Sequence, residues 1–76
     1  MKLHLGGEFS FYLPGHPSQV DVPLEGLARL SAILEGLGIP AAEIHLVVVN
    51  GELVDLQDAV VRQDDVVKLF PPVSGG

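Results

Sequence analysis

The dipeptide Asn50-Gly51 constrains the fold more than any other feature of this sequence, because it stands between two apolar runs. A type I′ turn needs positive φ at both of its central residues, and Asn-Gly adopts that geometry readily. The run before it, residues 44–49, is an almost continuous β-branched stretch, which is typical of a well-covered central strand. The sequence therefore predicts a β-hairpin with residues 52–56 as the short returning strand.

Three further strands are predicted, over residues 2–7, 19–22 and 66–70. In the first of them, Leu3 and Leu5 alternate with polar neighbours until Gly6-Gly7 break or bend the strand. The last one ends at Pro71-Pro72, because proline has no N–H to donate to a sheet.

A single apolar stripe predicts one helix, which we expect to begin at Pro23 or Leu24 and to run to about Gly36. The stripe recurs at the three- and four-residue spacing of a helix, in Leu27, Leu30, Ile33, Leu34 and Leu37. Gly36 and Gly38 are stop signals, and Pro40 cannot continue a helix. Such a helix covers one face of a sheet and leaves the opposite face open to a partner.

Two connections are less regular in sequence. Residues 8–13 alternate like a strand but could equally form an irregular loop, and residues 57–65 predict a turn or a short 3₁₀ segment. The predicted order is thus ββαβ(β)β, which is an α+β fold. We expect one domain over residues 1–72 and a flexible tail over residues 73–76.

The charge balance narrows the classes of partner. Ten acidic residues face four bases in a chain of 76 residues, for a formal net charge of −6. A nucleic-acid partner requires clustered Lys and Arg, which this sequence lacks. The acidic surface either steers the chain toward a basic protein surface or keeps it soluble. With no cysteine, no secretory signal and no membrane-length apolar run, we expect a cytoplasmic chain, monomeric when free, without membrane attachment.

The sequence predicts no catalytic site, no metal site and no bound cofactor. His4, His16 and His45 are scattered without the spacing of metal ligands, and no phosphate-binding loop is present. Asp64-Asp65 is a carboxylate pair, but ahead of a strand such a pair is usually a solvated turn. Together with Arg62, it could also make electrostatic contacts with a partner.

The sequence ends in Phe70-Pro71-Pro72-Val73-Ser74-Gly75-Gly76. The two prolines stiffen the chain as it leaves the last strand, because proline fixes φ. The two glycines have no side chains, so they can thread a narrow tunnel in any backbone geometry. This combination suits a terminal carboxylate that must enter the active site of another enzyme.

The same ending, with Asn50-Gly51 and Asp64-Asp65 before it, resembles the MoaD/ThiS family of ubiquitin-like sulfur carriers. The Phe-Pro-Pro-Val-x-Gly-Gly pattern is most similar to the small subunit of molybdopterin synthase. The resemblance covers residues 24–76, whereas the first 23 residues depart from the family pattern. It implies a β-grasp fold, with a mixed four- to five-stranded sheet and one main helix packed across it.

The resemblance also implies a function for the tail. Gly76 would be adenylated by an ATP-dependent activating enzyme (MoeB/ThiF-like) that supplies ATP and Mg²⁺. A sulfur donor protein would then convert it to a thiocarboxylate. A sulfur-acceptor enzyme, such as the large subunit of molybdopterin synthase, would receive the sulfur. This chain would then be the non-catalytic small subunit of that synthase.

The resemblance gives the remaining residues of the ending supporting roles. Gly75, Ser74 and Val73 would thread the tail, with Val73, Pro71 and Pro72 at the mouth of the tunnel. Phe70 would seat in a partner pocket, although its alternation with Val66 and Lys68 also fits a plain strand residue.

Several functions share this tail. The leading interpretation is sulfur transfer for the molybdenum cofactor. The alternatives are a carrier for thiamine thiazole, tRNA thiolation or amino-acid synthesis, a ubiquitin-like modifier conjugated through Gly76, or a non-covalent β-grasp interaction domain.

Overall fold

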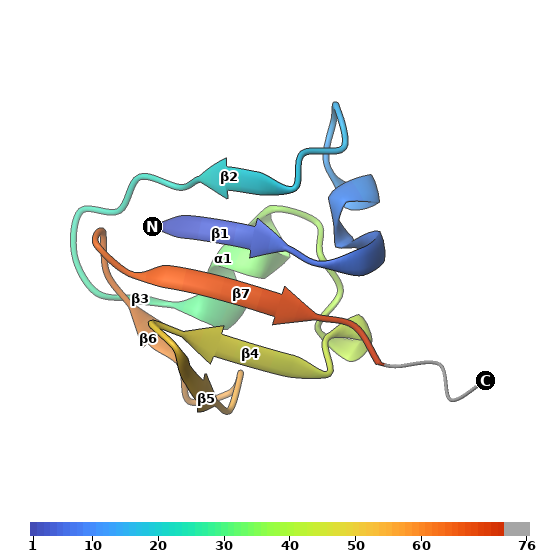
Figure 1. Cartoon of the computed structure of the whole chain (residues 1–76). Coiled ribbons are helices and arrows are strands. Elements are labelled where there is room, and N and C mark those ends of the chain that lie inside the picture. The colour runs from blue at the N-terminus through green and yellow to red at the C-terminus, as the bar shows by residue number, and fades with distance from the viewer. Residues whose placement is uncertain (73–76) are drawn as a thin grey trace.

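A five-stranded mixed sheet crossed by one helix forms the body of the molecule (Figure 1). The structure is a computed structural model that describes residues 1–72. The strands of the main sheet run in the order β2-β1-β7-β4-β5. Their bounds are Lys2–Leu5 for β1, Gln19–Asp21 for β2, Leu46–Val49 for β4, Glu52–Val54 for β5 and Val66–Phe70 for β7.

The remaining elements lie outside that sheet, behind it or at its end (Figure 1). They are β3 (Ala28–Arg29) and β6 (Val60–Val61), which pair as a two-stranded ribbon, the helix α1 (Leu30–Gly36), and the 3₁₀ helices η1 (Gly7–Tyr12) and η2 (Ala41–Glu43). In Figure 1, α1 lies behind the sheet, so the view looks onto the open face.

The centre of the sheet joins the two ends of the sequence. β1 pairs in parallel with β7, and every other pair in the main sheet is antiparallel. Parallel neighbours need a long crossover connection, which α1 supplies here. The predicted α+β arrangement, a mixed sheet with one main helix, is therefore confirmed.

The hairpin predicted at Asn50-Gly51 is also confirmed. Asn50 has a φ of 51° and Gly51 a φ of 84°, as a type I′ turn requires. The returning strand is shorter than predicted and ends at Val54. β4 lies inside the sheet, but only one of its faces is covered, since Val47 is buried and Leu46 is 40% exposed.

The predicted start of the helix was wrong. α1 begins at Leu30, because the two residues before it are extended and pair with β6. The N–H of Leu30 donates to the carbonyl oxygen of Ala59 (3.1 Å), which ties the first helical residue to that ribbon. Leu27 was placed in the buried stripe, but it is 67% exposed and lies outside the helix.

The end of the helix follows the prediction closely. Gly38 has a φ of 78°, the left-handed conformation that glycine adopts without steric cost. The N–H groups of Gly38 and Ile39 donate to the carbonyl oxygens of Glu35 and Leu34 (both 3.0 Å), which is a Schellman motif. Ile39 is buried beside the helix end, so the motif also contributes to the core.

Two segments with no single predicted secondary structure, residues 8–13 and 57–65, contribute to the core. Within residues 57–65, Ala59 and Val61 are buried, so the apolar insert is a strand of the ribbon rather than part of a turn. In η1, Phe9 is almost fully buried, which answers the open question about residues 8–13.

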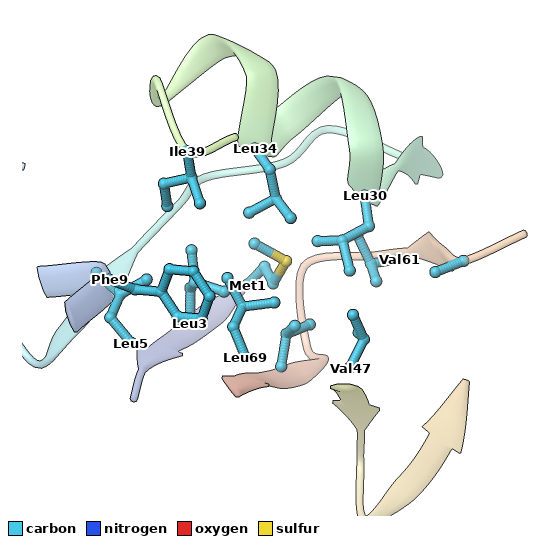
Figure 2. Packing of buried hydrophobic residues seen from close by; sticks show 12 residues of the cluster. Met1, Leu3, Leu5, Phe9, Leu30, Leu34, Ile39, Val47, Val61 and Leu69 are labelled. Atoms are coloured by element: carbon cyan, nitrogen blue, oxygen red, sulfur yellow. The ribbon is translucent and has the colours of Figure 1, made fainter. Parts of the chain in front are cut away.

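The core fills the space between α1 and the sheet (Figure 2). Leu30 and Leu34 of α1 point toward Leu3, Val47 and Leu69 of the sheet. Each such side chain contributes about 1.5–3 kcal/mol when it is fully buried. Because these contacts use the helix side of the sheet, the other face keeps its side chains free.

Candidate functional site

The predicted partner-binding residues lie where the chain leaves the sheet. Phe70 is the last residue of β7, and Pro71 and Pro72 follow it. We call these three residues the exit segment. Val73, Ser74, Gly75 and Gly76 lie outside the described residues, so their threading and modification roles stay predictions.

Backbone hydrogen bonds hold β7 on both sides up to its last residue. On one side, the N–H of Gly6 donates to the carbonyl oxygen of Leu69 (3.2 Å). On the other side, the N–H of His45 donates to the carbonyl oxygen of Phe70 (2.9 Å). The residues that follow therefore leave from a rigid base, which is what precise positioning of a reactive group requires.

Gly6 and Gly7 brace the exit segment through close packing. A Cβ added to Gly7 would lie 2.7 Å from Cγ of Pro71, and Gly7 has a φ of 57°. A Cβ added to Gly6 would lie 2.8 Å from the carbonyl oxygen of Leu69. Glycine is needed at both positions because a side chain would clash, and at Gly7 also because its φ is positive. The sequence indicated only a break in the strand at this point, and nothing in it signalled the contact with Pro71.

Phe70 is accessible to a partner. It is 39% exposed and stands on the open face, opposite Leu46 of β4. The alternation of Val66, Lys68 and Phe70 along β7 also holds, as expected for an ordinary strand. The accessibility that an anchor needs is present, and the anchor role itself remains a prediction.

Apolar side chains continue from Phe70 across the open face. Lys68 pairs in register with Val48 on one side and with His4 on the other, and Val48 pairs with Leu53. Leu53 is exposed, as is Lys68. We call Leu46, Val48, Leu53 and Phe70 the open-face patch. It is an apolar surface with a lysine beside it, on a chain that is acidic overall.

The other end of β7 is held by side chains. Asn50 donates from Nδ2 to Oδ1 of Asp65 and accepts from the N–H of Val66 at its Oδ1 (both 2.9 Å). The N–H of Arg62 donates to Oδ2 of Asp65 (2.9 Å). These hydrogen bonds, that from Asn50 foremost, lower the pKa of Asp65. The prediction of a solvated pair holds for the exposed Asp64, whereas Asp65 has a structural role.

No metal site or membrane span is found in the part of the chain that the structure describes. Within residues 1–72, no three His, Cys, Asp or Glu side chains are grouped so that they could hold a metal ion. Over the same residues, no helix has the length and apolar character needed to cross a bilayer.

Fold and exit segment together define a class. A sheet with parallel first and last strands, one helix across it and a chain that leaves from the last strand is a ubiquitin-like β-grasp protein. The sequence profile of the ThiS family matches residues 12–76, and the chain belongs to this family of small, non-catalytic sulfur carriers. The match leaves out β1 and most of η1, in the region where the sequence departs from the family pattern.

Solved structures support the same fold. A crystal structure of the thiamine biosynthesis protein (ThiS) from Geobacter metallireducens is 22% identical, with both chains covered completely and a TM-score of 0.60. An NMR solution structure of a thiamine biosynthesis protein from the same organism is 26% identical, with a TM-score of 0.52. That alignment covers all of this chain and 88% of the other. No curated protein sequence matches the chain.

Proposed function

We propose that the chain carries sulfur on Gly76, which a partner enzyme adenylates and a sulfur donor then converts to a thiocarboxylate. The observation that carries the proposal is the exit segment, which is held by hydrogen bonds at the end of β7 and by the packing of Gly7 on Pro71, and which two residues separate from the diglycine. Membership of the ThiS family supports the carrier role.

The proposed chemistry takes place at the carboxyl carbon of Gly76. A carboxylate is a poor electrophile, so one of its oxygens first attacks the α-phosphate of ATP and pyrophosphate leaves. Hydrosulfide from the sulfur donor then attacks the carbonyl carbon, AMP leaves with that oxygen, and the thiocarboxylate remains on Gly76. The activating enzyme supplies ATP and Mg²⁺, and this chain acts as a tethered group carrier.

The braced exit segment suits such a carrier. Residues 73–76 can span at most about 14 Å when fully extended. The position of Gly76 in a partner's active site therefore depends on where Pro72 sits. A fixed starting point lowers the ordering cost of the reactive complex and favours productive geometry.

We further propose that the open-face patch is where the activating enzyme docks. Contiguous exposed apolar surface is typical of protein interaction sites. Phe70 belongs to both the patch and the exit segment, so docking and tail insertion are coupled through one residue. Pro71 and Pro72 would then line the mouth of the partner's tunnel.

For the pathway, the comparisons favour transfer to a thiamine precursor. The two solved structures, a crystal and an NMR structure of one Geobacter metallireducens protein, carry the name thiamine biosynthesis protein, and both alignments cover this whole chain. The second candidate is molybdopterin synthesis, which the ending Phe70-Pro71-Pro72-Val73 favours. We place thiamine first because its support extends over the complete domain.

Intact-mass measurement tests the carrier role. The chain is incubated with its activating enzyme, ATP, Mg²⁺ and a sulfur donor, and we expect the mass increase of one oxygen replaced by sulfur at Gly76. An isopeptide-linked adduct, or an unchanged mass, would contradict the proposal. Growth of cells that lack the chain, with and without thiamine, then distinguishes the thiamine pathway from the molybdopterin pathway.

A further inference from the structure

Three exposed aromatic residues belong to elements at the end of the molecule from which the chain leaves. The chain has three phenylalanines and one tyrosine, and only Phe9 is buried in the core. The others are Phe70 on β7 and, on η1, Phe11 (65% exposed) and Tyr12 (43% exposed). In Figure 1, η1 lies at the same end of the sheet as the carboxyl end of β7.

We call the two exposed aromatic residues of η1, Phe11 and Tyr12, the aromatic ledge. The ThiS family profile begins at Tyr12, so most of η1 falls outside it. Phe11 lies just outside the matched residues, and Tyr12 is the first of them.

Neighbouring rings hold the ledge in place. The Phe11 ring meets the His16 ring edge-on, with centroids 4.8 Å apart, and the Tyr12 ring lies 6.4 Å from that of Phe9. His16 has a φ of 50°, an uncommon conformation for a residue with a side chain. Such strain is concentrated at functional sites. Aromatic rings oriented in advance lose little freedom on binding, which makes them effective anchors.

The short tail places a partner beside the ledge. η1 begins at Gly7, which packs against Pro71, and six residues of 3₁₀ helix extend about 12 Å. An enzyme that takes Gly76 into its active site must come within about 14 Å of Pro72. The surface around its tunnel therefore faces η1 as well as Phe70.

We propose that the aromatic ledge is a second docking element, which contacts the activating enzyme beside its tunnel. This rests on the proposed function, because only an enzyme that receives the tail must approach this end. The matching surface would be an apolar depression with a polar group for the Tyr12 hydroxyl.

Steady-state adenylation tests the ledge. Full-length wild type and the double variant Phe11→Ala/Tyr12→Ala are assayed for pyrophosphate release with the activating enzyme, ATP and Mg²⁺. We expect KM to rise about tenfold or more in the double variant, with kcat within about twofold. Leu27→Ala is the matched control, because Leu27 is 67% exposed and lies directly before β3, outside the aromatic ledge and the open-face patch. Its KM should stay at the wild-type value.

The possible outcomes separate the two proposals. An unchanged KM in the double variant, with wild type adenylated normally, overturns the ledge and leaves the carrier role intact. If wild type itself is not adenylated, the carrier role is wrong and the ledge falls with it. If the double variant shows no cooperative thermal transition, the single variant Phe11→Ser is assayed in its place. The Phe11 side chain is largely in solvent, so this substitution should leave the fold intact. A raised KM for Phe11→Ser supports the ledge, and an unchanged one refutes it.

Discussion

The two ends of β7 are held in different ways. Backbone hydrogen bonds are present at both ends, but at the start Asn50 and Asp65 also use their side chains to bind neighbouring backbone and each other. At its finish, backbone hydrogen bonds and the packing of Gly7 on Pro71 hold the chain, and Phe70 remains exposed. The start stabilises the fold with polar side chains, whereas the finish is rigid without using them. Side chains at the finish are therefore available to a partner.

Deletion of Gly76 should have the largest effect on activity. We expect adenylation to fall to background. The tail is then one residue shorter, so its terminal carboxylate no longer reaches the end of a tunnel of fixed depth. The thermal midpoint should not change, since the core lies within residues 1–72. Pyrophosphate release and a thermal melt check both expectations. Near-normal adenylation, or a lower midpoint, would count against a role confined to the tail.

Gly7→Ala should have the next largest effect, a loss in the free energy of unfolding. The substitution acts at the finish of β7. A Cβ in left-handed backbone costs about 1–2 kcal/mol, and its clash with Pro71 adds about 1–3 kcal/mol. Gly15→Ala is the matched control, because Gly15 has a φ of 79° but nothing within 4 Å of the added Cβ. Denaturant unfolding should show a smaller loss for Gly15→Ala.

A double-variant cycle then assigns the difference to one contact. Pro71→Ala removes the ring that meets the added Cβ, so Gly7→Ala should destabilise that background about as much as Gly15→Ala destabilises wild type. Equal losses from Gly7→Ala with and without the Pro71 ring would mean that the ring does not brace the exit.

The contact tested by Gly7→Ala also marks what the sequence could not predict. The Asn50-Gly51 hairpin and the Gly38 helix end depend on local backbone geometry, which residue type signals directly. The helix start was missed because residues 28–29 pair with a strand distant in sequence. Gly7 and Pro71 likewise meet only after β1 and β7 pair, so neither residue signals the contact by itself. The exit segment was predicted from its motif, and its bracing was not.

Asn50→Gly should weaken the start of β7 and leave the finish unchanged. Glycine keeps the positive φ of the turn, so the substitution removes only the two side-chain hydrogen bonds to Asp65 and Val66. We expect a loss of about 1–2 kcal/mol in the free energy of unfolding. The KM for adenylation should be unchanged. A rise in KM would show that the two ends of β7 are not independent.

The pH dependence of stability should show the smallest effect, again at the start of β7. Hydrogen bonds from Asn50 and from the N–H of Arg62 lower the pKa of Asp65 below its ordinary value of 3.8. A carboxylate whose pKa is lower in the folded state stabilises the fold above its unfolded pKa and loses that contribution as pH falls through the folded value. Wild type should therefore lose stability below about pH 4, by less than about 1 kcal/mol from this partly exposed group.

Asp65→Asn should remove that part of the loss of stability at low pH. Thermal melts at a series of pH values from 6 to 2 measure it. Asp64→Asn is the matched control, because the hydrogen bonds at this end of β7 are made by Asp65. If both substitutions flatten the curve equally, the acid sensitivity comes from general charge repulsion. A selective effect of Asp65→Asn locates the acid sensitivity in the hydrogen bonds that hold the start of β7.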